Sequence, residues 1–314
     1  MMPEYKPKTP AVVDISKVDG SPYPRKIDFS TDMSRYKTSK QTMGDPLINY
    51  EGKSNPYIDY QSIDLLLSLQ HPRSEGYDEM CFYVMGQVKE ILFKGLHFEL
   101  FNAREQIKLD EINNAITILE RSIDYVKFIA DAWNILSTIK PEGFNQFRDY
   151  LGTASGQLSF MYRHVEFILG NKSEKMASAH KNVPHVWPEI KKNLETPSLY
   201  DEVIFYLNRK GHAISEAVLD RDWKETYKYN QSVKDAWFSV YREPSNANLI
   251  YKLGESLISF DEQFSIYRWR HYTLVKKIIG FKSGTGGSSG VEWLEKVTSH
   301  QFFPELWEIR NELS

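Results

Sequence analysis

Cysteine is almost absent from this sequence, which has only Cys81 among its 314 residues. A single cysteine excludes an intrachain disulfide and a zinc site built from cysteines. No apolar run approaches the roughly 18 residues that a membrane span requires. The first stretch, residues 1–10, is polar and contains proline and lysine, which argues against a secretory signal. We therefore expect a cytoplasmic protein that does not bind membranes.

Strand patterns, repeats and histidine pairs are missing as well. No segment alternates apolar and polar residues for long enough to build a sheet, and no fixed period repeats along the chain. None of the eight histidines stands in an H-x-x-x-H or H-E-x-x-H pair, the spacings by which a helix binds zinc. The net charge of −3, with both signs interspersed, gives no reason to expect nucleic acid as a partner.

What the sequence does contain is helical periodicity. Apolar residues recur at three- and four-residue steps over 78–107 and 110–139, which predicts two helices longer than the usual ~11–12 residues. We expect Asp78 to cap the first helix and Pro141-Glu142-Gly143 to close the second. Further helices are predicted over 57–70, 158–169, 199–209, 211–219, 223–240 and 246–258, with an irregular stretch over 171–200.

These helices indicate an all-α fold with a single helical-bundle domain, because long paired helices with short connections form bundles. No internal linker is evident, so we predict that this domain covers residues 51–314. Residues 1–50 contain prolines, glycines and charges without sustained periodicity. We expect them to form an extended N-terminal arm that lies on the surface or on a neighbouring subunit.

The most unusual stretch is 264–293, where a helix pattern runs into a glycine-rich loop. Its first half places His271 on one face with other mainly apolar residues, namely Phe264, Tyr267, Arg268, Val275, Ile278 and Ile279. Gly280 is expected to end this helix. The loop at 284–290 holds only glycine, serine and threonine, so its backbone must bend sharply or lie close against another segment. The spacing of Ser289 and Glu292 predicts a capping box that begins the next helix.

The residues alone leave several interpretations of a site open. The loop lacks the lysine of a P-loop and follows a helix, which favours a tight turn over a nucleotide site. His271 is either a satisfied core histidine or the single imidazole that a haem iron requires. Arg148, in an aromatic segment, is suited to bind a carboxylate of the protein or of a ligand. Four basic side chains either face haem propionates or form a solvated helix face: Arg268, Arg270, Lys276 and Lys277.

Several blocks of the sequence together resemble the tryptophan 2,3-dioxygenase family of haem enzymes. They cover most of the chain from Tyr57 to Leu313 and include D-E-M-x-F at 78–82, F-R-D-Y-L-G-T-A-S-G at 147–156, Y-R-x-x-E-F-I-L-G-N-K at 162–172, P-S-L-Y-D-E at 197–202, W-R-H-Y-T-L-V-K-K-I-I-G at 269–280, G-T-G-G-S-S-G at 284–290 and F-F-P-E-L-W at 302–307. The resemblance implies an all-α homotetramer that binds haem b. It also implies the addition of both atoms of O₂ across the indole C2–C3 bond of L-tryptophan, giving N-formylkynurenine.

The resemblance further implies roles for individual residues. His271 matches the proximal iron ligand, Arg148 the partner of the substrate α-carboxylate, and Thr285 a threonine near the substrate ammonium and carboxylate. The positions that match the haem surroundings are Trp269, Tyr162 and Gly286. The positions that match the substrate pocket are Phe82, Ser155 and, from a neighbouring subunit's helix, Tyr57, Tyr60 and Gln61.

The sequence departs from the family pattern on the indole-facing side. Gly86 stands where the family has a histidine that reaches the indole N–H, and glycine inside a helix costs about 1 kcal/mol relative to alanine. Gln61 stands where an apolar residue is usual, and residues 154–159 read A-S-G-Q-L-S in place of A-S-G-F-Q-S. The iron ligand and the amino-acid anchors are kept, whereas the wall opposite them is altered.

Three functions fit these features. The favoured one is a dioxygenase acting on L-tryptophan or a substituted tryptophan. The second is a repurposed haem oxygenase that inserts one oxygen atom into a modified aromatic amino acid, as in oxindole formation. The third is a non-catalytic haem-binding or sensor protein, against which Arg148 and Thr285 argue, because a sensor needs no carboxylate clamp.

Overall fold

The computed structural model describes residues 25, 27, 29–50, 55–242, 244–245 and 248–313. Within these residues every regular element is a helix, which confirms the predicted all-α class. The chain divides into two compact units, residues 1–72 and 73–314. This division falls after Pro72, and the predicted domain boundary after residue 50 stays a prediction. None of the described helices is long and apolar enough to cross a membrane.

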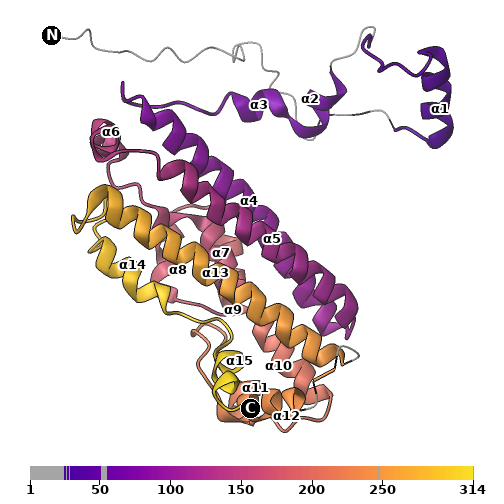
Figure 1. Ribbon diagram of the computed structural model, residues 1–314, viewed down its shortest axis with the longest axis vertical. Helices are drawn as coiled ribbons and strands as arrows, with labels where there is room; N and C mark the ends of the chain where they lie inside the picture. Colours follow the sequence, from indigo (N-terminus) through magenta and orange to yellow (C-terminus); the bar gives the residue numbers. More distant parts are fainter. Residues whose placement is uncertain are drawn as a thin grey trace. The chain divides into compact units, whose positions relative to one another are not determined.

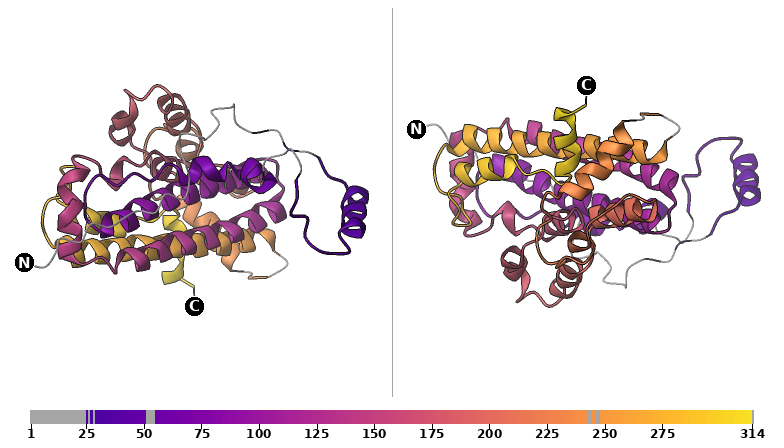
Figure 2. Two further views of the ribbon diagram at one scale, coloured as in Figure 1. Left: turned by 90° about the horizontal axis from the view of Figure 1, so that it is seen from above. Right: turned by 90° about the horizontal axis from the view of Figure 1, so that it is seen from below.

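Three long helices form the framework of the larger unit (Figure 1). They are α4 (Asp78–Lys108), α5 (Ile112–Leu136) and α13 (Leu249–Ile279). Helix α5 packs along both of the others, and Figure 2 shows α5 and α13 side by side. The predicted apolar stripe of α5 is buried at Ile112, Ile116, Leu119, Val126 and Ala130. This stripe makes α5 the central helix of the three.

A three-residue turn joins α4 to α5. Asp110 lies in it with a φ of +62°, a left-handed conformation that aspartate tolerates better than most residues. Its carboxylate accepts hydrogen bonds from Arg209 (2.7 Å) and Lys210 (2.9 Å) at the end of α10 (Leu199–Arg209). The two cations therefore fix the turn that sets α4 and α5 antiparallel.

Helix α13 is one continuous helix, where the sequence predicted a separate helix over 246–258 before the stretch at 264–279. The residues between, 259–263, contain neither proline nor glycine, so nothing interrupts the backbone hydrogen bonds. Asp261 in this segment accepts hydrogen bonds from the Phe302 N–H (2.9 Å) and the Trp307 indole (3.0 Å). Gly280 ends the helix with a φ of +60°, as predicted.

Shorter helices surround this framework. In the larger unit they are α6 (Pro141–Phe147), α7 (Phe160–Ile168), α8 (Glu174–Ala177), α9 (Trp187–Glu195), α10, α11 (Glu216–Leu219), α12 (Gln231–Tyr241), α14 (Val291–Thr298) and α15 (Pro304–Glu308). The predicted irregular stretch at 171–200 is wrong, because it contains α8 and α9. Pro188 and Pro141 both lie in first helical turns, where the missing N–H is not needed. Pro141 therefore begins α6 and does not close α5.

Two predicted capping interactions are also wrong. Tyr77 is the N-cap residue of α4, so Asp78 is already the first helical residue. Gly290 is the N-cap residue of α14, and Ser289 forms no capping box. At the start of α4 the carboxylate of Glu79 accepts backbone N–H groups of the preceding segment instead, at 2.8 and 2.6 Å. A buried acidic residue inside the first turn thus organises the chain before α4.

The part of the smaller unit that the structure describes has short helices and very few buried side chains. The expected extended arm is wrong at α1 (Asp32–Gln41), whose capping box joins Thr31 and Ser34. The predicted helix over 57–70 is broken at Ser62, which has a φ of +53° and separates α2 (Pro56–Gln61) from α3 (Ile63–Leu67). None of these three helices buries a residue.

Candidate functional site

The glycine-rich loop at 284–290 folds back on itself. The Gly284 N–H donates to the Ser288 carbonyl and the Gly287 N–H donates to the Gly284 carbonyl, both at 3.0 Å. Gly287 and Gly290 have φ angles of +78° and +65°, a region that glycine adopts without strain from a Cβ. The sharp bend predicted for this loop is therefore present.

The loop also lies close against a segment more than 120 residues earlier. The Thr285 hydroxyl donates to the Ala154 carbonyl (2.6 Å), and the Gln157 amide donates to the Gly286 carbonyl (3.2 Å). A Cβ placed on Gly286 would come within 2.7 Å of the Ser155 Cβ. Glycine is thus required at 286 for the two backbones to approach, and the predicted residues Ser155, Thr285 and Gly286 meet in one place.

Arg148 reaches the same place from the end of α6. It begins a short 3₁₀ helix (Arg148–Leu151), and its guanidinium donates to the Ser283 carbonyl at 2.7 Å. No carboxylate of the described residues forms an ion pair with it. An arginine presents five donors in a planar fork, so most of its binding capacity is left for a ligand.

Helix α4 supplies the apolar side of this region. The Phe82 ring packs on the rings of Phe144 (6.1 Å between centroids) and Phe147 (5.3 Å), the residue before Arg148. One turn further along α4, a Cβ built on Gly86 would meet nothing within 4 Å outside its own helical turn. Helix α4 therefore presents an aromatic side chain at Phe82 and, one turn later, an open space at Gly86.

His271 lies half-buried on α13, beside α5. Its imidazole stacks on the Trp133 indole, with 4.3 Å between ring centroids and 3° between the planes. Burial, together with the nearby charge of Lys89, lowers the pKa of His271 to about 3. Neither ring nitrogen has a hydrogen-bond partner in the part of the chain that the structure describes. The imidazole is therefore neutral at physiological pH and its lone pair is free.

Tyr162 belongs to the aromatic packing around this histidine. Its ring lies 5.4 Å from Phe93 and 6.3 Å from Tyr267, and the Tyr267 ring lies 5.6 Å from Trp133. Burial raises the pKa of the Tyr162 hydroxyl, so this phenol stays protonated. These rings connect α4, α7, α13 and α5 into one apolar wall.

Trp269 points to a different side of α13. Its side chain is 52% exposed and helps to line a groove of about 520 Å³ between α5 and α13. Its predicted place beside the haem stays a prediction.

Three of the basic residues near Trp269 lie on the exposed face of α13, as the solvated-face interpretation predicts: Arg270, Lys276 and Lys277. Arg268 instead is buried and donates to the His300 carbonyl at 2.7 Å.

Comparison with known proteins identifies the family. A family model described as tryptophan 2,3-dioxygenase matches residues 43–313. The chain belongs to the tryptophan 2,3-dioxygenase family. It is 41% identical over 261 residues to tryptophan 2,3-dioxygenase 1 of Ralstonia nicotianae and 42% identical over 261 residues to tryptophan 2,3-dioxygenase of Cupriavidus necator, covering 83% of this chain and 89% of each relative. With tryptophan 2,3-dioxygenase of Paraburkholderia phytofirmans it shares 37% identity over 306 residues, 98% of this chain and 100% of the relative.

Membership of the tryptophan 2,3-dioxygenase family confirms the predicted class, a haem-dependent oxidoreductase. Each of these relatives is named as a dioxygenase. The monooxygenase and sensor alternatives are therefore not favoured.

The residues around His271 fit the haem of the tryptophan 2,3-dioxygenase family. A single neutral imidazole with a free lone pair is the donor that a haem iron takes from a protein. No cluster of three or more His, Cys, Asp or Glu side chains among the described residues is arranged to hold a metal by itself. The Nε1 atom of Trp133 is buried without a partner in the described chain. The donor set thus suits a prosthetic group rather than a bare metal ion.

The smaller unit carries the remaining predicted site residues. Tyr57, Tyr60 and Gln61 lie on α2, and all three are exposed, with Tyr57 at 62% and Tyr60 at 72%. Exposed tyrosines on an unburied helix are available to a partner. Their predicted role in a neighbouring subunit's pocket stays a prediction.

Sequence reasoning missed two residues of the His271 surroundings, Trp133 and Lys89. The Lys89 ammonium lies 3.5 Å from the centroid of the Trp133 ring. A signal was present for Lys89, because it follows Gly86 by three residues and so shares its face of α4. No signal marked Trp133, since an aromatic residue in an apolar helix is ordinary core.

Proposed function

We propose that this protein is a dioxygenase that adds both atoms of O₂ across the indole C2–C3 bond of L-tryptophan or a substituted tryptophan. The product is the corresponding N-formylkynurenine, and the reaction needs no external reductant because both oxygen atoms enter one product. The observation that carries the proposal is the free, neutral imidazole of His271 in a chain of this family. We propose haem b as the cofactor and a cytoplasmic location, the latter in keeping with the single cysteine.

His271 would hold the haem iron through its free ring nitrogen. Bound haem supplies the O₂ chemistry, and the protein supplies binding and orientation. The pKa of about 3 keeps the imidazole unprotonated over the whole physiological range. The stack on Trp133 restricts ring rotation, so the nitrogen keeps one direction. A ligand atom held in advance in this way loses little entropy on binding.

Arg148 and Thr285 would hold the amino-acid part of the substrate. The free donors of Arg148 suit the α-carboxylate, and a charge-assisted, forked pair is among the stronger hydrogen bonds in proteins. Thr285 lies on a loop that is hydrogen-bonded to Ala154, so its hydroxyl is fixed near the same place. Ser155 and Phe82 would line the pocket beside them. The clamp therefore combines one charged group with a rigid loop.

Gly86 would set the size of the indole-facing side. The space beside its Cα is open, and no side chain from this position reaches an indole N–H. A substituent on the indole ring can occupy such a space, whereas a side chain there would exclude it. This observation supports including substituted tryptophans in the substrate class.

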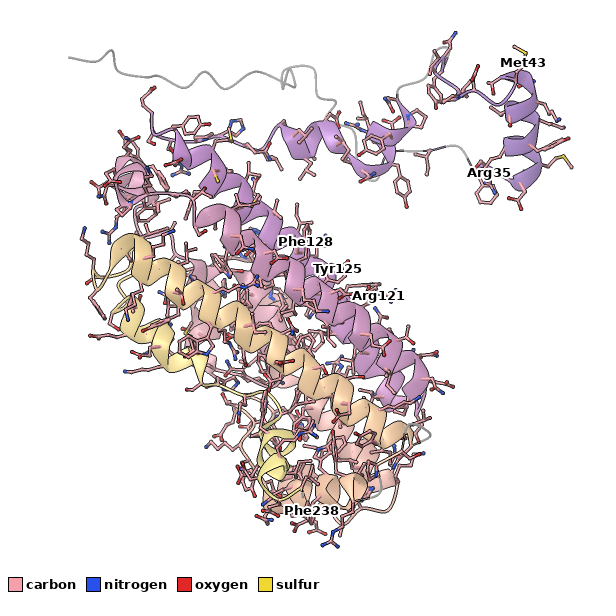
Figure 3. The ribbon with its side chains drawn as sticks, in the orientation of Figure 1. Arg35, Met43, Arg121, Tyr125, Phe128 and Phe238 are labelled. Carbon is pink, nitrogen blue, oxygen red and sulfur yellow. The ribbon has the colours of Figure 1, made fainter. Side chains whose placement is uncertain are left out.

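We propose that the protein is a homotetramer. Large apolar side chains are exposed along the outer side of α4 and α5: Ile91, Phe98, Phe128 and Ile135. Figure 3 shows Phe128 on the same side of α5 as Tyr125 and Arg121. In the smaller unit Phe29, Met43 and Ile48 are each about nine-tenths exposed. Apolar surface of this kind marks interaction sites.

The function is tested with reduced, haem-loaded protein, L-tryptophan and ¹⁸O₂. We expect N-formylkynurenine with two labelled oxygen atoms, seen as a near-ultraviolet absorbance band and by mass. A panel of ring-substituted tryptophans is run alongside to rank substrates by kcat/KM. His271→Ala should lose the Soret band and the activity together. A product with one labelled oxygen, or a Soret band unchanged in the His271→Ala variant, contradicts the proposal.

A further inference from the structure

Lys89 occupies an unusual position between the three long helices. It lies on α4, one turn after Gly86, and its ammonium reaches across to the Trp133 indole of α5, 3.5 Å from the ring centroid. The same indole stacks on the His271 imidazole of α13. The three side chains form what we call the lysine–tryptophan–histidine stack: Lys89, Trp133 and His271. The lysine is thus separated from the predicted iron ligand by no more than one aromatic ring.

The ammonium of Lys89 has no carboxylate within ion-pair distance in the described chain. No ion pair or hydrogen bond involves its ammonium, and its contact with Trp133 is a cation–π interaction. Its neighbour Glu90 attracts the ammonium electrostatically, but its carboxylate accepts hydrogen bonds from the Ser159 hydroxyl and the Met161 N–H. Asp131 on α5 pairs with Arg270 at 2.6 Å. The acids nearest in sequence on both helices are therefore engaged elsewhere.

Desolvation is the main effect on this lysine and lowers its pKa to about 7. Lys172 makes a useful comparison, since its pKa is lowered to about 7 for the same reason. Lys172, however, donates to the Leu194 carbonyl at 3.1 Å and to the Thr196 carbonyl. A cation away from water is stable only with compensating partners. Lys172 has them within the protein, whereas the half-buried Lys89 has only the Trp133 ring and the electrostatic attraction of Glu90 among the described residues.

The chemistry of the missing partner is that of a carboxylate beside the His271 site. A substrate α-carboxylate already has Arg148, whose guanidinium lies beside the glycine-rich loop and pairs with no carboxylate of the described residues. A haem carries two propionate carboxylates at its edge. We propose that Lys89 binds a haem propionate and so helps to position the haem on the lysine–tryptophan–histidine stack. This inference rests on the proposed function, because it requires haem at His271.

The test compares haemin with haemin dimethyl ester, in which both carboxylates are neutral. Apoprotein is titrated with each, and Kd is taken from the Soret absorbance and from quenching of tryptophan fluorescence. The variants are Lys89→Gln and, as matched control, Lys94→Gln, which removes an exposed lysine of the same helix. We expect Lys89→Gln to weaken haemin binding about 10-fold, as loss of a partly desolvated ion pair does. It should leave ester binding unchanged, and Lys94→Gln should change neither.

Lys89→Arg is the conservative variant, and it should keep most of the haemin affinity because the positive charge remains. Urea unfolding of each apoprotein shows whether the variants are folded. The wild-type preference for haemin over its ester is a second measurement that needs no variant. The inference is overturned if Lys89→Gln weakens the binding of haemin and of the ester equally. It is also overturned if the variant weakens the binding of neither. A change of the ferric spectrum from six- to five-coordinate in Lys89→Gln also overturns it, since the amine would then be an iron ligand. If wild-type protein binds no haemin at all, the proposed function fails first.

Discussion

The imidazole of His271 lies parallel to the indole of Trp133, with 4.3 Å between ring centroids. The two rings come from α13 and α5, which pack along their length. The framework of the larger unit therefore sets the position of the histidine, and no flexible loop does. A ligand built on packed helices is held more precisely than one built on a loop.

Truncation of Trp133 should disturb both stability and haem binding. Its side chain is buried and fills the space between α5 and α13. Replacing a buried tryptophan by alanine costs about 3–5 kcal/mol. We expect Trp133→Ala to lower the free energy of unfolding by about 3 kcal/mol in urea, and to weaken haemin binding. Trp133→Phe keeps an aromatic face. Its losses in the free energy of unfolding and in the free energy of haemin binding should each be less than half of those in Trp133→Ala. Unchanged stability in the alanine variant would show that the stack is not part of the core.

Arg148 should act on substrate binding and leave haem binding alone. Arg148→Met removes the proposed carboxylate partner, and we expect KM for L-tryptophan to rise about 100-fold, the effect of losing a forked, charge-assisted pair. The Soret spectrum should not change. L-Tryptophanamide, which has no carboxylate, provides the matched ligand control. Wild type should discriminate strongly between the acid and the amide, and Arg148→Met should hardly do so. Equal discrimination by both proteins contradicts the proposed clamp.

Gly86 and Gly95 lie on the same helix and should respond to alanine in opposite ways. A Cβ at Gly86 meets open space, so Gly86→Ala should stabilise α4 by up to about 1 kcal/mol. A Cβ at Gly95 would come within 2.6 Å of the Tyr125 ring, so Gly95→Ala should destabilise the packing of α4 on α5. Thermal unfolding of the two apoproteins measures the difference. Destabilisation by Gly86→Ala would mean that its space is filled.

Two adjacent histidines, the half-buried His97 and the buried His164, should make the protein sensitive to mild acid. Desolvation and their mutual proximity lower the pKa of His97 to about 4, and desolvation lowers that of His164 to about 4. The Asn193 amide nitrogen lies 3.2 Å from one ring nitrogen of each histidine, Nε2 of His97 and Nδ1 of His164. The unfolded chain binds protons on histidine below a pH of about 6.5, while the folded chain does not until about pH 4. Unfolding therefore takes up protons in this window.

The free energy of unfolding should consequently fall as pH decreases from 6.5 to 4, by up to about 1.4 kcal/mol per pH unit for each histidine. Urea titrations at several pH values measure the slope. The double variant His97→Gln/His164→Gln should have a shallower slope than wild type. His185→Gln removes an exposed histidine and serves as control. An unchanged slope in the double variant contradicts the assignment.

The apolar outer side of α4 and α5 should be an interface between subunits. Phe98 is 65% exposed and Phe128 is 62% exposed. We expect the double variant Phe98→Glu/Phe128→Glu to lower the mass measured by light scattering to that of a smaller assembly, because it places charges in an apolar contact. Glu120→Lys, which changes an exposed charge on α5, is the control. A tetramer that persists in the double variant places the interface elsewhere.

Much of the fold could be predicted because it depends on short-range patterns. The long helices α4 and α5 were predicted within three residues at each end, from residues three or four positions apart. Gly280 ends α13 as predicted, since a left-handed residue favours glycine whatever surrounds it. The break at Ser62 and the continuity of α13 through Asp261 were missed. The continuity of α13 depends on what the segment packs against, which local sequence does not encode, and nothing in the local sequence marks Ser62 as a left-handed residue.

For the candidate site, the sequence by itself determined which residue types are present. Through the family resemblance, it also determined which residues match the family's site positions. The tertiary structure decided which of them meet. It brings Arg148 and Ser155 close to the loop that carries Thr285, about 130 residues later, and it brings Lys89 and His271 into contact with the same side chain, Trp133. Helical periodicity reports only which face of a helix is buried. Which side chains touch across that face depends on how three helices pack, and only the folded chain specifies that.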